Sequence, residues 1–311
     1  MRKLLVICVS ACLLAFAPKP PADLKLEYTF GMGDELEWNQ SAKQAITQTI
    51  MGMDQEVKTN VASGLLLKVV KLTPTGAQLE ARYKTLMLQT ALPMGMGEYG
   101  LNSQGAQDKP ENQIAKAITD KPFTVYMTRL GEVEKVEGTE NLWSGFDKVE
   151  MDADKKAKLK EQLQQSFNDE SVKAQLEAGL MRYPNKPIKT GDTWMSKSNM
   201  PLTFPLSANN TWSVGDITEA LVKVNCKSAI ETYDKNKVIV VPPGLKSKMD
   251  MSGTLKLDGA VNPKTGWPSQ VKTTSEIKGI MTLLAGGMIP TDMDVPMLIK
   301  METTYTIRVK K

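Results

Sequence analysis

Regular alternation of apolar and polar residues is the feature that most constrains this chain. From Ile299 to Val309 every second residue is apolar or a threonine, and charged residues and threonines fill the positions between them. A period of two predicts a β-strand with one buried and one solvated face. The same pattern recurs at residues 24–30, 78–84, 222–227 and 255–261.

Short polar turns separate these runs, as at residues 73–76, 130–132, 233–237 and 262–266. Strands joined in this way form antiparallel meanders, whereas parallel strands need long crossover connections. We therefore predict a mainly β fold of the β-rich α+β kind, built on a curved antiparallel sheet or a half-open barrel.

The pattern changes to a helical period over residues 151–183. Apolar residues recur there at every fourth position, in two runs: Leu159, Leu163 and Phe167, then Val172, Leu176 and Leu180. Asp152 and Asp169 precede the two runs and suit helix N-termini. This segment predicts a helical hairpin.

These elements predict a single β-rich domain over residues 23–311. One meander occupies residues 23–130 and the other residues 187–311, and the helical segment 151–183 lies between them. Residues 91–122 and 284–296 are rich in glycine, proline and methionine, and we expect them to form long loops.

The N-terminus has the features of a secretory signal peptide, with a basic head followed by an apolar run over residues 4–17. We assign residues 1–22 to this signal and a short linker. Ala15 and Ala17 fit the small-x-small rule and offer one cleavage site after residue 17, and residues 9–12 resemble a lipobox that would make Cys12 the lipidated first residue. We expect an exported protein of the periplasm or cell surface, either free or anchored through Cys12, without a transmembrane helix in the mature chain.

Histidine is absent from the sequence, which excludes triads and metal sites that depend on imidazole. Cys226 is the one cysteine outside the signal region and lies on the apolar phase of its strand, so we expect a buried, unreactive thiol. We find no motif for a catalytic nucleophile or a calcium loop. We therefore expect no enzymatic activity and no cofactor or metal.

Basic and acidic residues are interspersed along almost every segment, and the formal net charge is only +4. Nucleic-acid binders usually concentrate their basic residues on one face, so we expect no nucleic-acid partner. The expected partners are lipid or another apolar ligand, or proteins of the cell envelope.

Several turn-and-strand segments resemble an uncharacterised family of exported bacterial β-rich proteins, known as a domain of unknown function. The matching segments are residues 128–138, 183–194, 253–258, 265–268 and 276–279. The resemblance implies a secreted or surface-anchored protein and supplies no catalytic residues. In architecture alone, the expected fold is also similar to the half-open barrels of bacterial lipoprotein carriers, in which a curved sheet holds an apolar ligand beneath helices.

The leading hypothesis is an exported, non-enzymatic binding or envelope-associated protein that holds a hydrophobic ligand, such as a lipid, between its sheet and helices. Methionines in or beside the expected loops are the candidate cavity residues, because their side chains adapt to variable ligands: Met87, Met94, Met96, Met281, Met288 and Met297. The alternative is a structural or interaction module with a filled core and no ligand. An outer-membrane barrel is disfavoured, because only 6% of the residues are aromatic and such barrels carry aromatic girdles.

Overall fold

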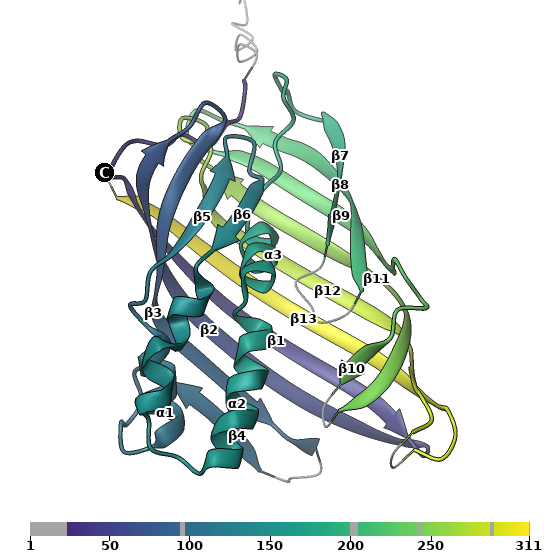
Figure 1. Cartoon of the computed structure of the whole chain (residues 1–311). Coiled ribbons are helices and arrows are strands. Elements are labelled where there is room, and N and C mark those ends of the chain that lie inside the picture. The colour runs from purple at the N-terminus through teal and green to yellow at the C-terminus, as the bar shows by residue number, and fades with distance from the viewer. Residues whose placement is uncertain (1–23, 94–96, 200–204, 242–243, 287–288, 311) are drawn as a thin grey trace, which may run out of the picture.

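The computed structural model describes residues 24–93, 97–199, 205–241, 244–286 and 289–310. One curved antiparallel sheet of 13 strands dominates the described part of the chain (Figure 1). The sheet does not close into a barrel, because β6 and β7 form its two ends and do not pair with each other. The prediction of a mainly β fold with a curved antiparallel sheet is confirmed.

The first half of the sheet is a meander in the spatial order β6-β5-β3-β2-β1. Its strands are β1 (Glu35–Ile50), β2 (Met53–Leu72), β3 (Gly76–Ala91), β5 (Phe123–Thr128) and β6 (Val133–Glu137), and the short β4 (Glu98–Asn102) pairs with β3. This half ends at residue 137, slightly beyond the predicted end at residue 130.

The second half is a meander in the order β13-β12-β11-β9-β8-β7. Its strands are β7 (Thr193–Asn199), β8 (Leu206–Ile217), β9 (Val222–Thr232), β11 (Leu245–Val261), β12 (Pro268–Leu283) and β13 (Met293–Lys310), with β10 (Ile239–Val241) paired to β11. The two meanders join where β1 pairs with β13 over a register that runs from Glu35 opposite Lys310 to Gln48 opposite Met297.

The predicted helical hairpin is present as α2 (Ala153–Ser166) and α3 (Asp169–Gly179). Asp152 caps α2 as expected, because its side chain accepts a hydrogen bond from the Lys155 amide at 3.1 Å. The cap of α3 is Asn168 and not Asp169; the Asn168 side chain accepts from the Ser171 amide at 2.8 Å. Figure 1 shows both helices in front of the concave side of the sheet.

The prediction of a long loop over residues 91–122 is wrong. This stretch contains β4 and the helix α1 (Pro110–Ile118), and a 3-10 helix η2 (Thr139–Lys148) follows β6. Ile114 and Ile118 are fully buried, so α1 is held by apolar packing that its polar, proline-containing sequence obscures. The second expected loop, residues 284–296, is also shorter than predicted, because β13 begins at Met293.

Residues 24–30 alternate in burial as predicted, but they lie outside the sheet. This extended segment crosses one end of the sheet and bonds to distant turns: the Tyr28 amide donates to the Arg129 carbonyl at 2.8 Å, and the Thr29 amide donates to the Thr265 carbonyl at 2.9 Å. Gly266 permits this close approach, since a Cβ there would lie 2.0 Å from the Glu27 carbonyl oxygen.

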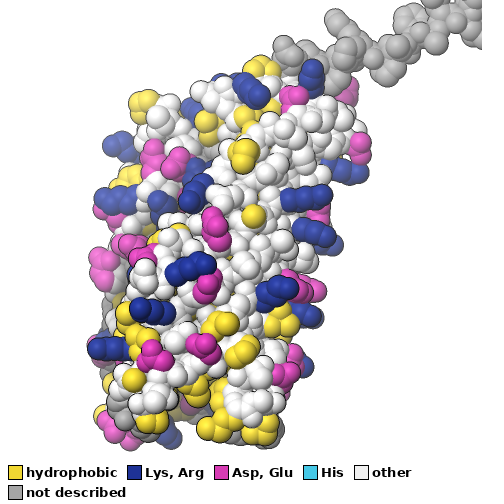
Figure 2. Space-filling model, turned by 90° about the vertical axis from the view of Figure 1, so that its right-hand side faces the viewer, with side chains coloured by type: hydrophobic (Ala, Val, Ile, Leu, Met, Phe, Trp, Pro, Cys, Tyr) yellow, Lys and Arg dark blue, Asp and Glu magenta, His cyan; other side chains and the backbone are white. Residues whose placement is uncertain are grey.

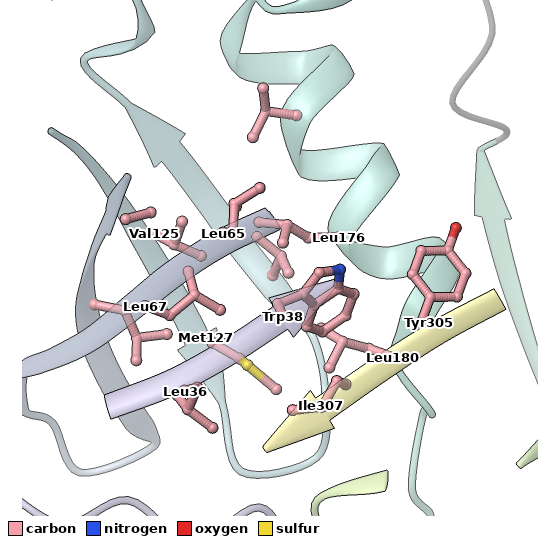
Figure 3. Close-up of a cluster of buried hydrophobic side chains, with 14 of the residues drawn as sticks. Leu36, Trp38, Leu65, Leu67, Val125, Met127, Leu176, Leu180, Tyr305 and Ile307 are labelled. Atoms are coloured by element: carbon pink, nitrogen blue, oxygen red, sulfur yellow. The ribbon is translucent and has the colours of Figure 1, made fainter. Parts of the chain in front are cut away.

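Two separate apolar clusters fill parts of the concave side. The larger cluster joins residues of both meanders to α3 and the extended segment. In Figure 3, Leu176 of α3 and Leu180, which follows α3, lie on either side of Trp38, with Tyr305 nearby. The smaller cluster occupies the other end of the concave side and includes Met249, Ile277 and Ile299. None of the described helices is long and apolar enough to cross a membrane.

Candidate ligand cavity

A cavity of about 460 Å³ lies between the two helices α2 and α3 and the concave face of the sheet. Residues from both meanders line it, including Leu86 of β3, Trp212 of β8 and Leu257 of β11. The prediction placed a cavity beneath the helical segment 151–183, and the described residues contain one there. Its volume falls within the range of about 300–1,000 Å³ typical of small-ligand sites.

The helical hairpin forms the apolar cover of the cavity. Leu163 and Phe167 at the end of α2, and Ala178 and Leu180 at the end of α3, line it. Trp38 of β1 supports α3 from below, with its ring 5.7 Å from the ring of Tyr305. The end of α3 therefore packs on an aromatic pair of the sheet, and Tyr305 of this pair also lines the cavity.

Beyond this aromatic pair the concave side is closed by tightly packed aromatic rings. The Tyr28 ring lies 5.0 Å from Tyr183 and 4.7 Å from Trp267. The Tyr28 hydroxyl accepts from the Met181 amide at 2.9 Å, and the Tyr183 hydroxyl donates to the Gly266 carbonyl at 2.7 Å. We call this cluster of Tyr28, Tyr183 and Trp267 the closed end.

The cavity walls carry polar residues as well as apolar ones. Between the two apolar clusters, polar residues occupy inward positions of β1, β2, β3, β8, β9, β12 and β13, whereas β11 contributes Leu255 and Leu257. We call the following set the polar belt: Gln40, Gln44, Thr59, Thr90, Asn210, Ser228, Thr273, Ser275 and Thr303. All of these except Ser275 line the cavity.

On the β7–β9 side, the belt satisfies its own polar atoms. The Ser228 hydroxyl donates to the Asn210 side-chain carbonyl at 2.6 Å, and the Asn210 amide donates to the Ser198 hydroxyl at 3.0 Å. The Trp212 indole donates to Ser196 at 2.9 Å. This network fixes the wall and leaves few free partners for a ligand.

On the central strands the belt is different. Thr303 of β13 pairs in register with Ala42 of β1 and with Thr273 of β12, and both threonines are more than nine-tenths buried. Their hydroxyls take no part in the side-chain hydrogen bonds that the structure shows within its described residues. The buried Ser275 hydroxyl likewise has no hydrogen-bond partner among them. We call Gln40, Gln44, Thr273, Ser275 and Thr303 the belt floor.

Charge within the cavity is restricted. Among the described residues that line it, none is lysine or arginine, and Glu177 of α3 is the single carboxylate. Burial raises the pKa of Glu177 above its ordinary value, although Arg182, whose guanidinium lies 3.1 Å from the carboxylate, opposes that shift. The cavity therefore offers no positive charge of its own to an anionic ligand.

Cys226 is buried, as predicted, and shares its strand phase with Val222, Val224 and Ile230. Its side chain lies against the cavity, 3.5 Å from the Ser228 hydroxyl. Burial raises the pKa of the Cys226 thiol. Its low reactivity remains a prediction.

The structure does not bring the candidate methionines together. Met87, Met281 and Met297 lie in strands β3, β12 and β13, and none of the three lines the cavity. Met281 and Met297 belong to the smaller apolar cluster. Cys12, Met94, Met96 and Met288 lie outside the described residues.

The sequence-based prediction missed the cavity residues because it placed them in the expected loops and not at the inward-facing positions of the strands. The signal was available: Gln40 and Gln44 share the inward phase of Trp38, and Thr273 and Ser275 share that of Val271. Polar residues in a phase that is otherwise apolar indicate a polar site on the buried face of a sheet. Within the described residues, no group of three or more acidic or cysteine side chains could hold a metal ion.

Charged side chains of both signs are interspersed on the outer surface (Figure 2). Hydrophobic side chains gather toward the lower end of the face shown there. The exposed apolar residues of the described chain include Met51 and Met53 at the tip of the β1–β2 hairpin and Val240 of β10.

Fold and cavity together define a class of protein: an open, curved β-sheet with a helical cover over a lined cavity. The chain belongs to a family of unknown function, DUF6263, whose model matches residues 75–268. The resemblance to a domain of unknown function is thus confirmed, and four of the five matching segments fall inside the matched region.

The chain is also similar to solved structures. One is described as lipid–protein interactions in lipovitellin, with 8% identity and a TM-score of 0.48; the alignment covers 91% of this chain and 26% of that one. Another is the COG4313 outer membrane channel from Pseudomonas putida F1, with 9% identity and a TM-score of 0.28, covering 94% of this chain and 99% of that one. This chain thus spans about a quarter of the lipovitellin chain. No curated protein sequence matches this chain.

Proposed function

We propose that this protein is an exported, non-enzymatic carrier or receptor that holds one hydrophobic or amphiphilic molecule in the cavity beneath α2 and α3. The observation that carries the proposal is the cavity of about 460 Å³ enclosed by both meanders and the helical hairpin. Leucine, phenylalanine and tryptophan side chains form much of its wall, and burial of ligand hydrocarbon against them is favourable by about 25 cal/mol per Å².

Three features of the molecule support binding over a purely structural role. Apolar clusters lie on both sides of the cavity, and members of the larger one, among them Leu163, Phe167 and Trp212, present apolar surface to its inside. The end of α3 packs against Trp38 and Tyr305, so its position does not depend on whether a ligand fills the cavity. The belt floor presents polar groups toward the inside, where a filled structural core would carry apolar residues.

Native mass spectrometry of protein purified under mild conditions tests the proposal, with solvent extraction to identify any bound molecule. We expect an added mass that extraction removes and that a neutral lipid restores. A control variant, Ala178→Trp, places a large ring in the cavity and should abolish the added mass. A protein that carries no such mass and binds no apolar probe would support the alternative of a structural module with a filled core.

The intact mass also tests the export prediction. Processing after residue 17 or thereabouts removes the apolar run, whereas lipidation adds a diacylglycerol mass that Cys12→Ala abolishes. An unprocessed Met1 terminus in correctly localised protein would contradict export by this signal.

A further inference from the structure

The polar belt limits the chemistry of the ligand, and the first limit is charge. Described residues that line the cavity include no lysine and no arginine, and the one carboxylate, Glu177 of α3, is already paired with Arg182. An anionic headgroup placed inside would lose its hydration without gaining an ion pair, which is costly in a buried site. The cavity is therefore poorly suited to a fatty acid or a phospholipid phosphate.

The second limit is the presence of unused hydrogen-bonding groups. Thr273 and Thr303 line the cavity next to each other across β12 and β13, and neither hydroxyl takes part in a side-chain hydrogen bond within the described residues. Gln44 lies on β1 opposite Met301, which is two residues from Thr303 in β13. Leaving such groups buried without partners costs about 1–3 kcal/mol each, so a ligand that can bond to them is favoured.

The third limit comes from the arrangement of apolar surface around the belt. The cover contributes Leu163 and Phe167, and the opposite wall contributes Leu255 and Leu257. A ligand that fills the cavity therefore meets hydrocarbon from the cover and from part of the sheet, together with a row of hydroxyl and amide groups on the central strands. Such a site fits a molecule with a hydrocarbon chain and one neutral polar group.

We propose that the cavity binds a neutral amphiphile, such as a long-chain alcohol, an amide or a monoglyceride, with its polar group hydrogen-bonded to Thr273, Thr303 and Gln44 of the belt floor. This inference rests on the proposed function, because it names the ligand class of the same cavity. It goes further in assigning the contact residues and in excluding anionic lipids as the preferred ligands.

The test compares three ligands of equal chain length, dodecanol, dodecanoate and dodecane, by displacement of an environment-sensitive naphthylamine dye from the full mature chain at neutral pH. The double variant Thr273→Val, Thr303→Val removes both hydroxyls and keeps side-chain volume. The matched control is Thr274→Val, Thr304→Val, which changes the next residue of each strand on the opposite, outer face. Thermal unfolding of each variant confirms that it is folded.

We expect the wild-type protein to bind dodecanol more tightly than dodecanoate. The inner double variant should weaken dodecanol binding by about tenfold, as expected for the loss of one or two buried hydrogen bonds. It should leave dodecane binding unchanged, and the outer control should change neither. Glu177→Gln removes a negative charge from the cavity lining, so it should narrow the difference in affinity between dodecanol and dodecanoate.

The possible failures are distinct. If none of the three ligands displaces the dye, or the dye itself does not bind, the proposed function fails. If dodecane and dodecanol respond equally to the inner variant, or dodecanoate is preferred, the cavity binds hydrocarbon but the assigned polar contacts are wrong. Should the inner variant not fold, the order of the three wild-type affinities still decides, because a preference for dodecanoate overturns the inference.

Discussion

The closed end and the polar belt lie on the same concave side of the sheet, yet different parts of the chain occupy the two places. At the closed end, aromatic rings from segments outside the strands have centroids 4.7–5.0 Å apart, and the two tyrosine hydroxyls bond to backbone groups. At the belt the inward positions hold threonine, serine and glutamine beside an open volume. The difference shows that alternation determines which face is buried but not whether that face is filled.

The largest expected effect comes from breaking the closed end. Tyr28→Ala removes a fully buried ring in contact with Tyr183 and Trp267, and should lower the free energy of unfolding by about 3–5 kcal/mol. Urea unfolding followed by tryptophan fluorescence measures it. Tyr28→Phe, which removes only the hydroxyl that bonds to Met181, should cost less, about 1–3 kcal/mol. A loss below about 1 kcal/mol for Tyr28→Ala would show that the closed end is not a main source of stability.

The second-largest effect is expected at the contact between α3 and the Trp38 and Tyr305 rings. A Cβ at Gly179 would lie 2.4 Å from the Trp38 ring and 2.8 Å from the Tyr305 ring, so α3 must move. Gly179→Ala should lower the free energy of unfolding by about 1–3 kcal/mol through overpacking. Trp38→Phe in the same chain frees part of this space, so the two substitutions should be less than additive. Strict additivity would indicate that α3 is not seated on Trp38.

Cys226 reports on access to the belt. Because burial raises its pKa and hides its sulfur, we expect a bulky thiol reagent to label it far more slowly in the native protein than in urea. Since Cys226 lines the cavity, a bound neutral amphiphile should slow the labelling further. Equal rates in native and unfolded protein would contradict the burial of this thiol.

The smallest expected effect is a pH dependence at the edge of the belt. The folded-state pKa of Glu177 is raised from 4.5 by burial, so the folded protein binds this proton more tightly than the unfolded chain. The resulting stability is present below pH 4.5 and is lost as the pH rises through the folded pKa. Relative to Glu177→Gln, the wild type should therefore lose stability as the pH rises, in urea unfolding measured across this range. A difference that does not change with pH would mean that Arg182 cancels the effect of burial.

The sequence predicted the parts of the fold that local periodicity controls. Alternation from Ile299 to Val309 and from Val222 to Cys226 gave strands with the correct inward phase. The two helices were found from their spacing and from Asp152. These features depend on residues near one another in the chain, where the period of the backbone directly sets which side chains share a face.

The misplaced features depend on partners that are far away in the chain. Residues 24–30 have the pattern of a sheet strand, but their hydrogen-bond partners, among them Arg129 and Thr265, are turns at the end of the sheet. The methionines were expected at the cavity because of their chemistry, while the register places Met281 and Met297 beside Val295 and Gly279 in a filled cluster. Register and curvature decide such positions, and neither can be read from local periodicity.

The extended segment 24–30 also has a consequence for the order in which the protein folds. Its hydrogen bonds reach residues 129 and 265, and the Trp267 indole donates to the Thr29 carbonyl across 238 residues of chain. Residues 24–30 can therefore dock only after the chain around Thr265 and Trp267, just before the last two strands, has reached its place. Contacts of such large sequence separation form slowly, so the closed end should assemble late, together with the equally distant pairing of β1 with β13.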